Sequence, residues 1–220
     1  MSEDIFDLED KPVDNDNPAK RMPVALVLDI SSSMSSDAKI DELNEGVRLL
    51  IDELKNNDKA RDSVEMSIIS FGGQVGVVEK FGEIESMQTP HMSANGNTPM
   101  GEAVSKALDM LDKRKKEYRG NGINYFQPVC VLMTDGHATD SIEQASAECL
   151  KLISQDKLIV IPIAIGNGAD MNQLSKFSTL RPISITENFS FLEFFKWLSA
   201  SIGGATGGAD VEKMFNELSN

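Results

Sequence analysis

The fold of this chain is decided by residues 24–34, which read VALVLDISSSM. The first five of these residues are apolar and form too short a run for a helix, so they predict a buried strand. Asp29 follows the strand directly, and Ser31 and Ser33 come in the turn after it. Open α/β sheets bind their ligands at the carboxyl ends of their strands. The stretch therefore predicts a central strand and a polar site at its end.

Four more apolar runs predict strands, and helical patterns separate most of them. The runs cover residues 64–71, 75–78, 129–133 and 158–165. The link between the first two, Gly72-Gly73-Gln74, is too short for a helical crossover, so these two strands should form an antiparallel hairpin. The alternation elsewhere predicts parallel pairing. We therefore expect a Rossmann-like, doubly wound α/β sheet in the order 3-2-1-4-5, mostly parallel, with one antiparallel edge strand and helices on both faces.

Apolar residues at helical spacing predict the helices, and the rest of the chain predicts the domain boundaries. The expected helices cover residues 40–54, 100–111, 142–153 and 190–202, and the aromatic stripe of the last is interpreted as core. Residues 1–20 predict an acidic, flexible arm. Residues 21–202 predict one domain. Residues 203–220 predict a glycine-rich linker and a short amphipathic segment, which either folds back onto the domain or docks on a partner.

Composition narrows the classes of partner and the cellular location. The 220 residues include 35 acidic and 21 basic side chains, for a formal net charge of −14. Such a charge repels nucleic acid and anionic lipid surfaces, so neither is an expected partner. No signal peptide opens the chain, and no apolar run reaches the roughly 18 residues that a membrane span needs. Cys130 and Cys149 do not have the spacing of a metal-binding site, and we expect both to be reduced core residues. This in turn predicts a cytoplasmic protein.

Two further oxygen donors are predicted at the edge of the sheet that carries Asp29, Ser31 and Ser33. Thr98 lies in a loop ahead of a helix, and Asp135 follows the strand 129–133. Hydroxyl and carboxylate oxygens suit a hard divalent cation, with Mg²⁺ expected first and Mn²⁺ and Ca²⁺ as alternatives. Two carboxylates do not over-neutralise such an ion. An octahedral cation held in this way keeps a position that an outside carboxylate can occupy.

Each of these residues also has an ordinary interpretation. Thr98 before Pro99 is typical of a helix start, and Asp135 before Gly136 is typical of a turn. The metal interpretation is favoured because five donors would share one sheet edge. Gly166-Asn167-Gly168 resembles part of a dinucleotide-binding loop, but Met171 stands where its third glycine belongs, so a plain turn is expected. His137 has no recognisable catalytic partner and predicts a solvent-facing loop residue.

The pattern Asp-x-Ser-x-Ser, a distant Thr and a distant Asp-Gly resembles the metal-ion-dependent adhesion site of von Willebrand factor type A domains. The resemblance covers residues 21–202 and implies the fold of that family. It implies that Ser31, Ser33 and Thr98 bind the ion directly or nearly so, and that Asp29 and Asp135 hold it directly or through water. The family commonly has glycine between the two serines, where this chain has Ser32.

Three other stretches resemble the bacterial tellurium-resistance TerY-type group of the same family. They read RMPV at residues 21–24, LNEG at 43–46 and FFKWLSAS at 194–201. This resemblance implies a cytoplasmic stress-response protein whose partners include a kinase or a phosphatase of the same system. No residue provides an evident binding site for tellurite itself.

The sequence favours a binding module over an enzyme. The leading hypothesis is capture of an Asp or Glu side chain of a protein partner through a shared divalent cation. The alternative is a metal-assisted phosphohydrolase, in which Asp29 is the nucleophile or the cation activates water. Asp29 lacks the second carboxylate two residues on that aspartate-based phosphotransferases use, which counts against this alternative. A third hypothesis is a scaffold that binds through the last helix or the tail.

Overall fold

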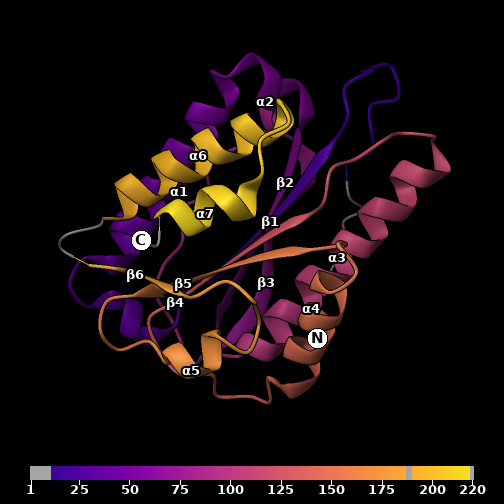
Figure 1. Ribbon diagram of the computed structural model, residues 1–220. Helices are drawn as coiled ribbons and strands as arrows, with labels where there is room; N and C mark the ends of the chain where they lie inside the picture. The colour runs from indigo at the N-terminus through magenta and orange to yellow at the C-terminus, as the bar shows by residue number, and fades with distance from the viewer. Residues whose placement is uncertain (1–10, 187–189, 219–220) are drawn as a thin grey trace, which may run out of the picture.

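The fold is a single mixed sheet with helices on both faces (Figure 1). The computed structural model describes residues 11–186 and 190–218. The sheet order is β3-β2-β1-β4-β5-β6, which confirms the predicted fold class and order and adds a sixth strand. The strands are β1 (Met22–Asp29), β2 (Val64–Gly72), β3 (Gln74–Glu83), β4 (Val129–Thr134), β5 (Ile159–Ile165) and β6 (Ile183–Ile185).

Pairing within the sheet follows the lengths of the connections. β1 pairs in parallel with β2 on one side and with β4 on the other. β2 and β3 pair antiparallel, as the short link predicts. The turn between them holds Gly73 at φ 71°, which is the left-handed region that favours glycine. The prediction missed β6 because its three residues, Ile-Ser-Ile, form no continuous apolar run.

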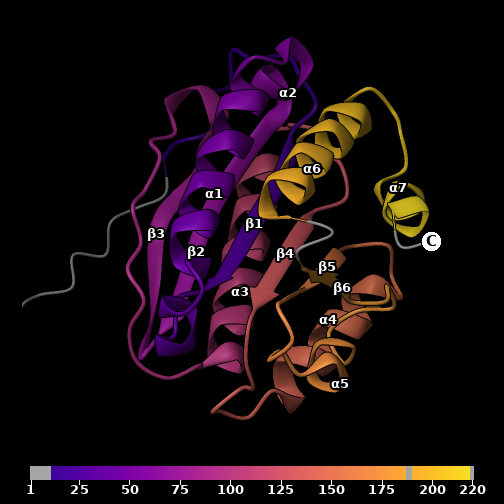
Figure 2. The same cartoon turned by 90° about the vertical axis from the view of Figure 1, so that its left-hand side faces the viewer.

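Two hydrophobic cores cover the two faces of the sheet, and β1 contributes side chains to both. Val24, Leu26 and Leu28 belong to one core, and Ala25 and Val27 belong to the other. The first core lies under α1 (Lys39–Lys55), α6 (Phe191–Thr206) and α7 (Val211–Leu218), and the second under α3 (Met100–Gly120) and α4 (Glu143–Ile153) (Figure 2). Shorter helices complete the fold: α2 (Asp58–Ser63), α5 (Met171–Leu174), η1 (Ser32–Ser35) and η2 (Ile84–Ser86).

The C-terminal region differs from the expected linker. Helix α6 runs on through Gly203 and Gly204 to Thr206. A Cβ on Gly203 would lie 2.8 Å from the side chain of Asn57, so this glycine allows close packing. The tail then folds back as α7, where Phe215 is buried and its ring lies 5.6 Å from that of Trp197. Of the two alternatives for the tail, the structure has the one that folds back.

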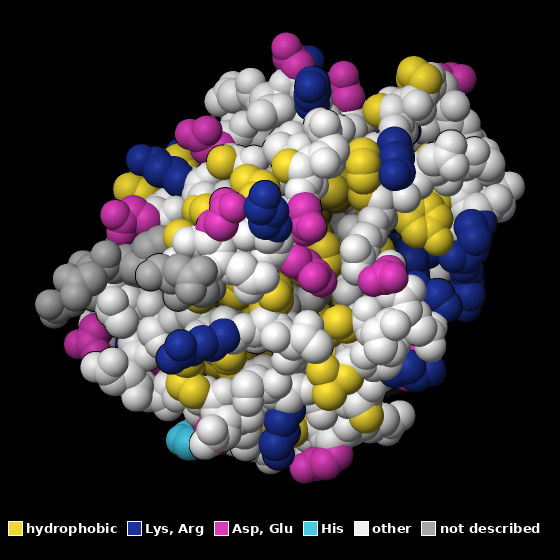
Figure 3. Space-filling model, in the orientation of Figure 1, with side chains coloured by type: hydrophobic (Ala, Val, Ile, Leu, Met, Phe, Trp, Pro, Cys, Tyr) yellow, Lys and Arg dark blue, Asp and Glu magenta, His cyan; other side chains and the backbone are white. Residues whose placement is uncertain are grey.

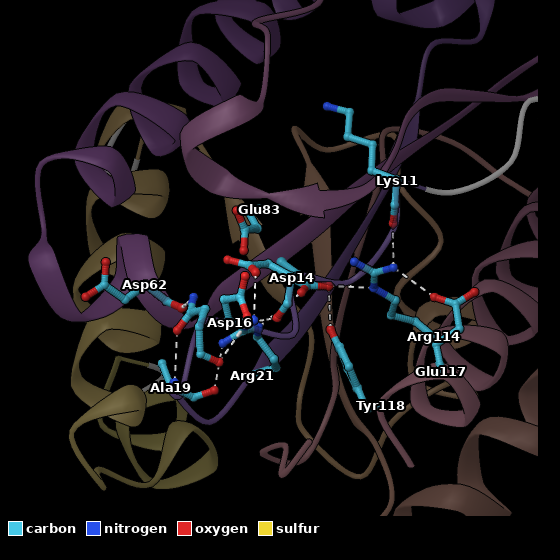
Figure 4. A network of polar contacts seen from close by, with 12 residues as sticks. Lys11, Asp14, Asp16, Ala19, Arg21, Asp62, Glu83, Arg114, Glu117 and Tyr118 are labelled. Atoms are coloured by element: carbon cyan, nitrogen blue, oxygen red, sulfur yellow. Dashed lines mark hydrogen bonds and ion pairs between the residues drawn. The ribbon is translucent and has the colours of Figure 1, made fainter. Parts of the chain in front are cut away.

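The described part of the N-terminal arm is bound to the domain by two buried arginines (Figure 4). Arg21 donates to the carbonyls of Asp14, Asn17 and Ala19, and Arg114 donates to that of Lys11. Residues 1–10 lie outside the described residues. The arm therefore lies against the domain from residue 11 onward.

Acidic and basic side chains are interspersed on the face shown in Figure 3. The net charge of −14 is therefore not gathered into one patch on that face. Among the described residues, no helix has the length and apolar character needed to cross a membrane.

Candidate functional site

The two predicted carboxylates lie at one edge of the sheet because β1 and β4 are parallel neighbours. Asp29 is the last residue of β1, and Asp135 comes directly after β4. Both side chains are buried. Ser31 and Ser33 lie in the loop and short helix that follow β1. The topology therefore places four of the five predicted site residues at the same edge.

Hydrogen bonds connect these four residues. Ser31 Oγ and Ser33 Oγ lie 3.0 Å apart, and the Ser33 hydroxyl donates to Asp135 Oδ1 over 2.5 Å. Asp29 Oδ1 accepts from the Ser31 backbone N–H at 2.7 Å, and its Oδ2 accepts from the Thr134 hydroxyl. The carboxylate of Asp29 thus fixes the start of the serine loop, and the second serine joins that loop to β4.

Thr98, the fifth predicted residue, lies in a loop that is bonded to the loops on both sides of it. The Asn95 N–H donates to the carbonyl of Ile30 at 2.7 Å, which ties this loop to the serine loop. On the other side, Thr98 N–H donates to Thr139 Oγ1 at 3.1 Å, and Thr139 N–H donates to the Thr98 carbonyl at 2.9 Å. Thr98 is therefore placed between the loops that carry the other four residues.

Glycines allow these loops to approach one another. A Cβ on Gly72 would lie 2.5 Å from the carbonyl oxygen of Ile30. Gly96 has φ +70°, and a Cβ there would lie 2.4 Å from Cα of Gly73. No larger residue fits at these positions without moving the backbone. The sequence prediction uses Gly72 only as part of the short hairpin link and does not foresee these close approaches.

The donor set fits a small divalent cation. Adjacent ligands of an octahedral Mg²⁺ with bonds of about 2.1 Å lie about 3 Å apart, which matches the observed 3.0 Å between the two serine oxygens. The described residues contain no group of three or more His, Cys, Asp or Glu side chains that could hold a metal. Any cation at this edge would therefore need the hydroxyl oxygens as well as the two carboxylates.

Burial raises the pKa of Asp29 above its usual value, and this is the largest effect on that carboxyl. Hydrogen bonds from Ser31 and Thr134 act in the opposite direction, and Asp135 adds a smaller repulsion that also raises the pKa. A nearby cation would favour the charged form of the same carboxyl. The site therefore holds a buried negative charge that a divalent ion would stabilise.

The sequence prediction missed Lys39, which also reaches the site. Its Nζ lies 2.9 Å from Asp135 Oδ2. Lys39 is the first residue of α1, and its side chain lines a groove of about 1030 Å³ together with Gly166, Ile185 and Phe191. The available signal was a lysine at the start of a helix, where the helix dipole disfavours a positive charge.

The two other features of this edge have ordinary roles. His137 is exposed, and its Nδ1 lies 3.1 Å from Asp170 Oδ2. Asp170 caps the short helix α5, because its side chain accepts from the N–H groups of Asn172 and Gln173. The stretch 166–168 is the turn that joins β5 to this helix.

A scan against protein-family models matches residues 24–196 to the von Willebrand factor type A domain. A search of curated proteins finds no match. Solved structures with the same fold include a von Willebrand factor type A protein from Catenulispora acidiphila. That structure has a TM-score of 0.67 and 17% identity, with 84% of this chain and 43% of that chain covered.

Two further solved structures extend the comparison. The domain of the type V pili tip protein Mfa5 from Porphyromonas gingivalis has a TM-score of 0.66 and 10% identity, with 87% of this chain and 98% of that chain covered. Proximal thread matrix protein 1 from the mussel byssus, described with a zinc-occupied MIDAS motif, has a TM-score of 0.57 and 18% identity. This comparison covers 86% of our chain and 47% of the mussel chain, so the chain spans less than half of that protein.

Proposed function

The chain belongs to the von Willebrand factor type A domain family, and we propose that it is a metal-ion-dependent protein-binding module. Domains of this family bind protein partners and are usually not catalytic. In our proposal Asp29, Ser31, Ser33, Thr98 and Asp135 hold one divalent cation, and the cation binds an Asp or Glu side chain of the partner. The observation that carries the proposal is the bonded chain of oxygens from Ser31 through Ser33 to Asp135.

The bound cation would supply a Lewis-acid position for an acidic side chain. The protein's own groups do the rest. Asp29 fixes the serine loop through the Ser31 N–H and the Thr134 hydroxyl. Ser31, Ser33 and Thr98 would contribute neutral oxygens, so the ion would keep part of its positive charge. Mg²⁺ is our first choice because all the donors are oxygens, and Mn²⁺ and Ca²⁺ are the alternatives.

A binding assay tests this function. The tagged chain would be used to capture partners from the native host, with Mg²⁺ present or with a chelator. We expect capture that needs the ion and that is lost in Asp29→Ala and in Asp135→Asn. The matched control is Asp170→Asn, which changes an aspartate of the neighbouring loop that bonds His137. Capture that survives the chelator and both site variants would contradict the proposal.

The alternative enzyme function has less support. Asp29 would be the nucleophile of a phosphohydrolase, but its side chain is buried and both its oxygens already accept hydrogen bonds. The described conformation therefore exposes no oxygen of Asp29 to a phosphoester. Hydrolysis of a phosphoester in the presence of Mg²⁺, abolished by Asp29→Asn, would favour the enzyme function over ours.

We place the module in a cytoplasmic bacterial stress-response system of the tellurium-resistance type. The support is the resemblance of three stretches to the TerY-type group, which lie at residues 21–24, 43–46 and 194–201. The partner that offers the acidic residue would then be a kinase or a phosphatase of the same system. Identification of the proteins that the capture assay retains tests this context separately from the cation site.

A further inference from the structure

Lys39 adds a fixed positive charge to the proposed cation site. Its ammonium lies 2.9 Å from Asp135 Oδ2, and its side chain is 19% exposed, whereas that of Asp135 is fully buried. The other oxygen of Asp135 accepts from the Ser33 hydroxyl. Each oxygen of this carboxylate therefore already has a donor. One donor is a proposed metal ligand and the other is a cation of the protein itself.

The chain holds Lys39 at this place with an unusual backbone. The two residues before it, Asp37 and Ala38, have φ values of 53° and 57°, a region that residues other than glycine rarely adopt. Outliers of this kind persist where the surrounding structure imposes them, and they gather at functional sites. On the other side of the lysine, a Cβ on Gly166 would lie 3.7 Å from Lys39 Cε, so the loop after β5 packs along its side chain.

We propose that Lys39 is a built-in competitor of the divalent cation. In the cation-free protein it supplies Asp135 with a counter-charge, and in the loaded protein it repels the ion. The inference rests on the proposed metal-dependent function and adds the regulation of the same site. It makes occupancy of the site sensitive to the concentration of free cation.

The charge balance explains what such a competitor does. Asp29, Asp135 and Lys39 together carry a formal charge of −1, and a divalent cation would turn this into +1. Without the lysine the same site would go from −2 to neutral. Lys39 thus lowers the affinity for the ion and leaves the loaded site with a positive charge. That charge favours the acidic side chain of a partner. Two acids on the same rim, Asp37 and Glu42, line the groove beside Lys39.

Calorimetric titration of the full chain with Mn²⁺ tests the inference. We expect Lys39→Met to bind Mn²⁺ about tenfold more tightly or better, because one repelling charge within a few ångströms is removed. Lys39→Arg keeps the charge and should bind as the native protein does. Lys151→Met is the control for overall charge, because Lys151 is an exposed residue of α4 that pairs with Glu148, and it should also leave the affinity unchanged.

Thermal melting of the same proteins gives a second measurement that does not need a partner. Without cation, Lys39→Met should melt below the native protein because Asp135 loses its counter-charge. With saturating Mn²⁺ this difference should shrink, so the rise in Tm on adding the ion should be larger in the variant. Lys39→Gln, whose amide can still donate to Asp135, replaces the methionine variant if that variant does not fold.

The outcomes separate this inference from the function on which it rests. The competitor role would be overturned if the native protein and Lys39→Met bind Mn²⁺ with affinities within twofold of each other. If Asp135→Asn loses Mn²⁺ binding in the same experiment, the proposed cation site itself would stand. Weaker binding in Lys39→Met would overturn the competitor role as well. Failure of Mn²⁺ to bind either protein would overturn the proposed metal-dependent function itself.

Discussion

The two ends of the sheet carry two very different groups of charges. At the carboxyl ends of β1 and β4, two buried carboxylates are bonded to hydroxyls and to one lysine. At the opposite end, Glu65 is fully buried and accepts from Arg21, Arg114 and the Tyr118 hydroxyl. In the Glu65 network, two arginines of the chain itself balance the carboxylate. The other end has fewer positive charges than carboxylates, and in our proposal it takes a divalent cation from the solvent.

We infer from this difference that the Glu65 network serves the fold and that the proposed cation site serves binding. Removing Glu65 takes the carboxylate from Arg21 and leaves Arg114 with that of Glu117, and a buried charge that loses its partner is strongly destabilising. The proposed cation site has neutral hydroxyls where that network has arginines. Its stability should therefore depend on what is dissolved around it, and the predictions below test this contrast.

The largest effect should come from Glu65→Ala. Fully buried Arg21 would lose the carboxylate that it pairs with, and fully buried Arg114 would keep only that of Glu117, so we expect the free energy of unfolding to fall by about 3–5 kcal/mol. Urea unfolding measures the loss. Glu79→Ala on the adjacent strand is the control, because its ion pair with Lys11 spans 3.4 Å and is partly exposed, so it should cost less than about 1 kcal/mol. Similar losses in the two variants would remove the contrast.

The next effect is stabilisation by the cation. At a cation concentration 100 times the Kd, the free energy of unfolding should rise by about 2.7 kcal/mol. For a domain of this size that corresponds to a Tm about 5–10 °C higher. Scanning calorimetry with Mg²⁺ and with a chelator measures the shift. Asp135→Asn should abolish it and Tyr118→Phe should keep it, whereas equal shifts in both variants would place the ion elsewhere.

A smaller effect is expected for Tyr118→Phe itself. The substitution removes a hydroxyl that donates to Glu65 over 2.7 Å in a buried setting, and we expect a loss of about 1.5–3 kcal/mol because the acceptor is charged. Tyr125→Phe is the matched control, because its hydroxyl accepts from Arg119 in an exposed setting. Urea unfolding should show almost no change for that variant. If both substitutions lower the free energy of unfolding equally little, the Glu65 network contributes less to stability than its burial suggests.

The smallest effect should be a pH dependence at Asp29. Burial raises the pKa of this carboxyl in the folded chain above its unperturbed 3.8, so the folded state holds the proton more tightly. The stability from this group is therefore present below the unperturbed value and is lost as the pH rises through the folded one. In the presence of a chelator, the free energy of unfolding of Asp29→Asn should therefore rise relative to that of the native protein over that pH range. Urea unfolding at a series of pH values measures this difference. If the native protein becomes more stable than Asp29→Asn as the pH rises over that range, the predicted direction is wrong.

Local spacing and sheet topology are enough to predict which of these oxygen-bearing side chains lie close together. Ser31 and Ser33 follow Asp29 within one turn, and Asp135 reaches them because its strand is a parallel neighbour of β1. Lys39 could not be predicted in the same way. Its side chain reaches Asp135 from a different element, the start of α1. The two residues before it, Asp37 and Ala38, have a left-handed backbone that no sequence pattern predicts.

The same limit applies to the fold. Continuous apolar runs predict five strands, because strands buried on both faces need apolar residues at every position. The glycines at 203 and 204 predict a linker because composition alone does not show what packs against them. Asn57 lies against Gly203, and only the packed structure reveals that contact. The carbonyls of the N-terminal arm that Arg21 binds carry no signal in the sequence either.

The most direct test of the central claim is an anomalous difference map from a crystal of the full chain soaked in Mn²⁺. Our account predicts one strong peak at bonding distance, about 2.1–2.4 Å, from the hydroxyl oxygens of Ser31 and Ser33, and no such peak in Asp135→Asn. A saturated crystal without a peak at this place, or with a peak only elsewhere, would contradict the account.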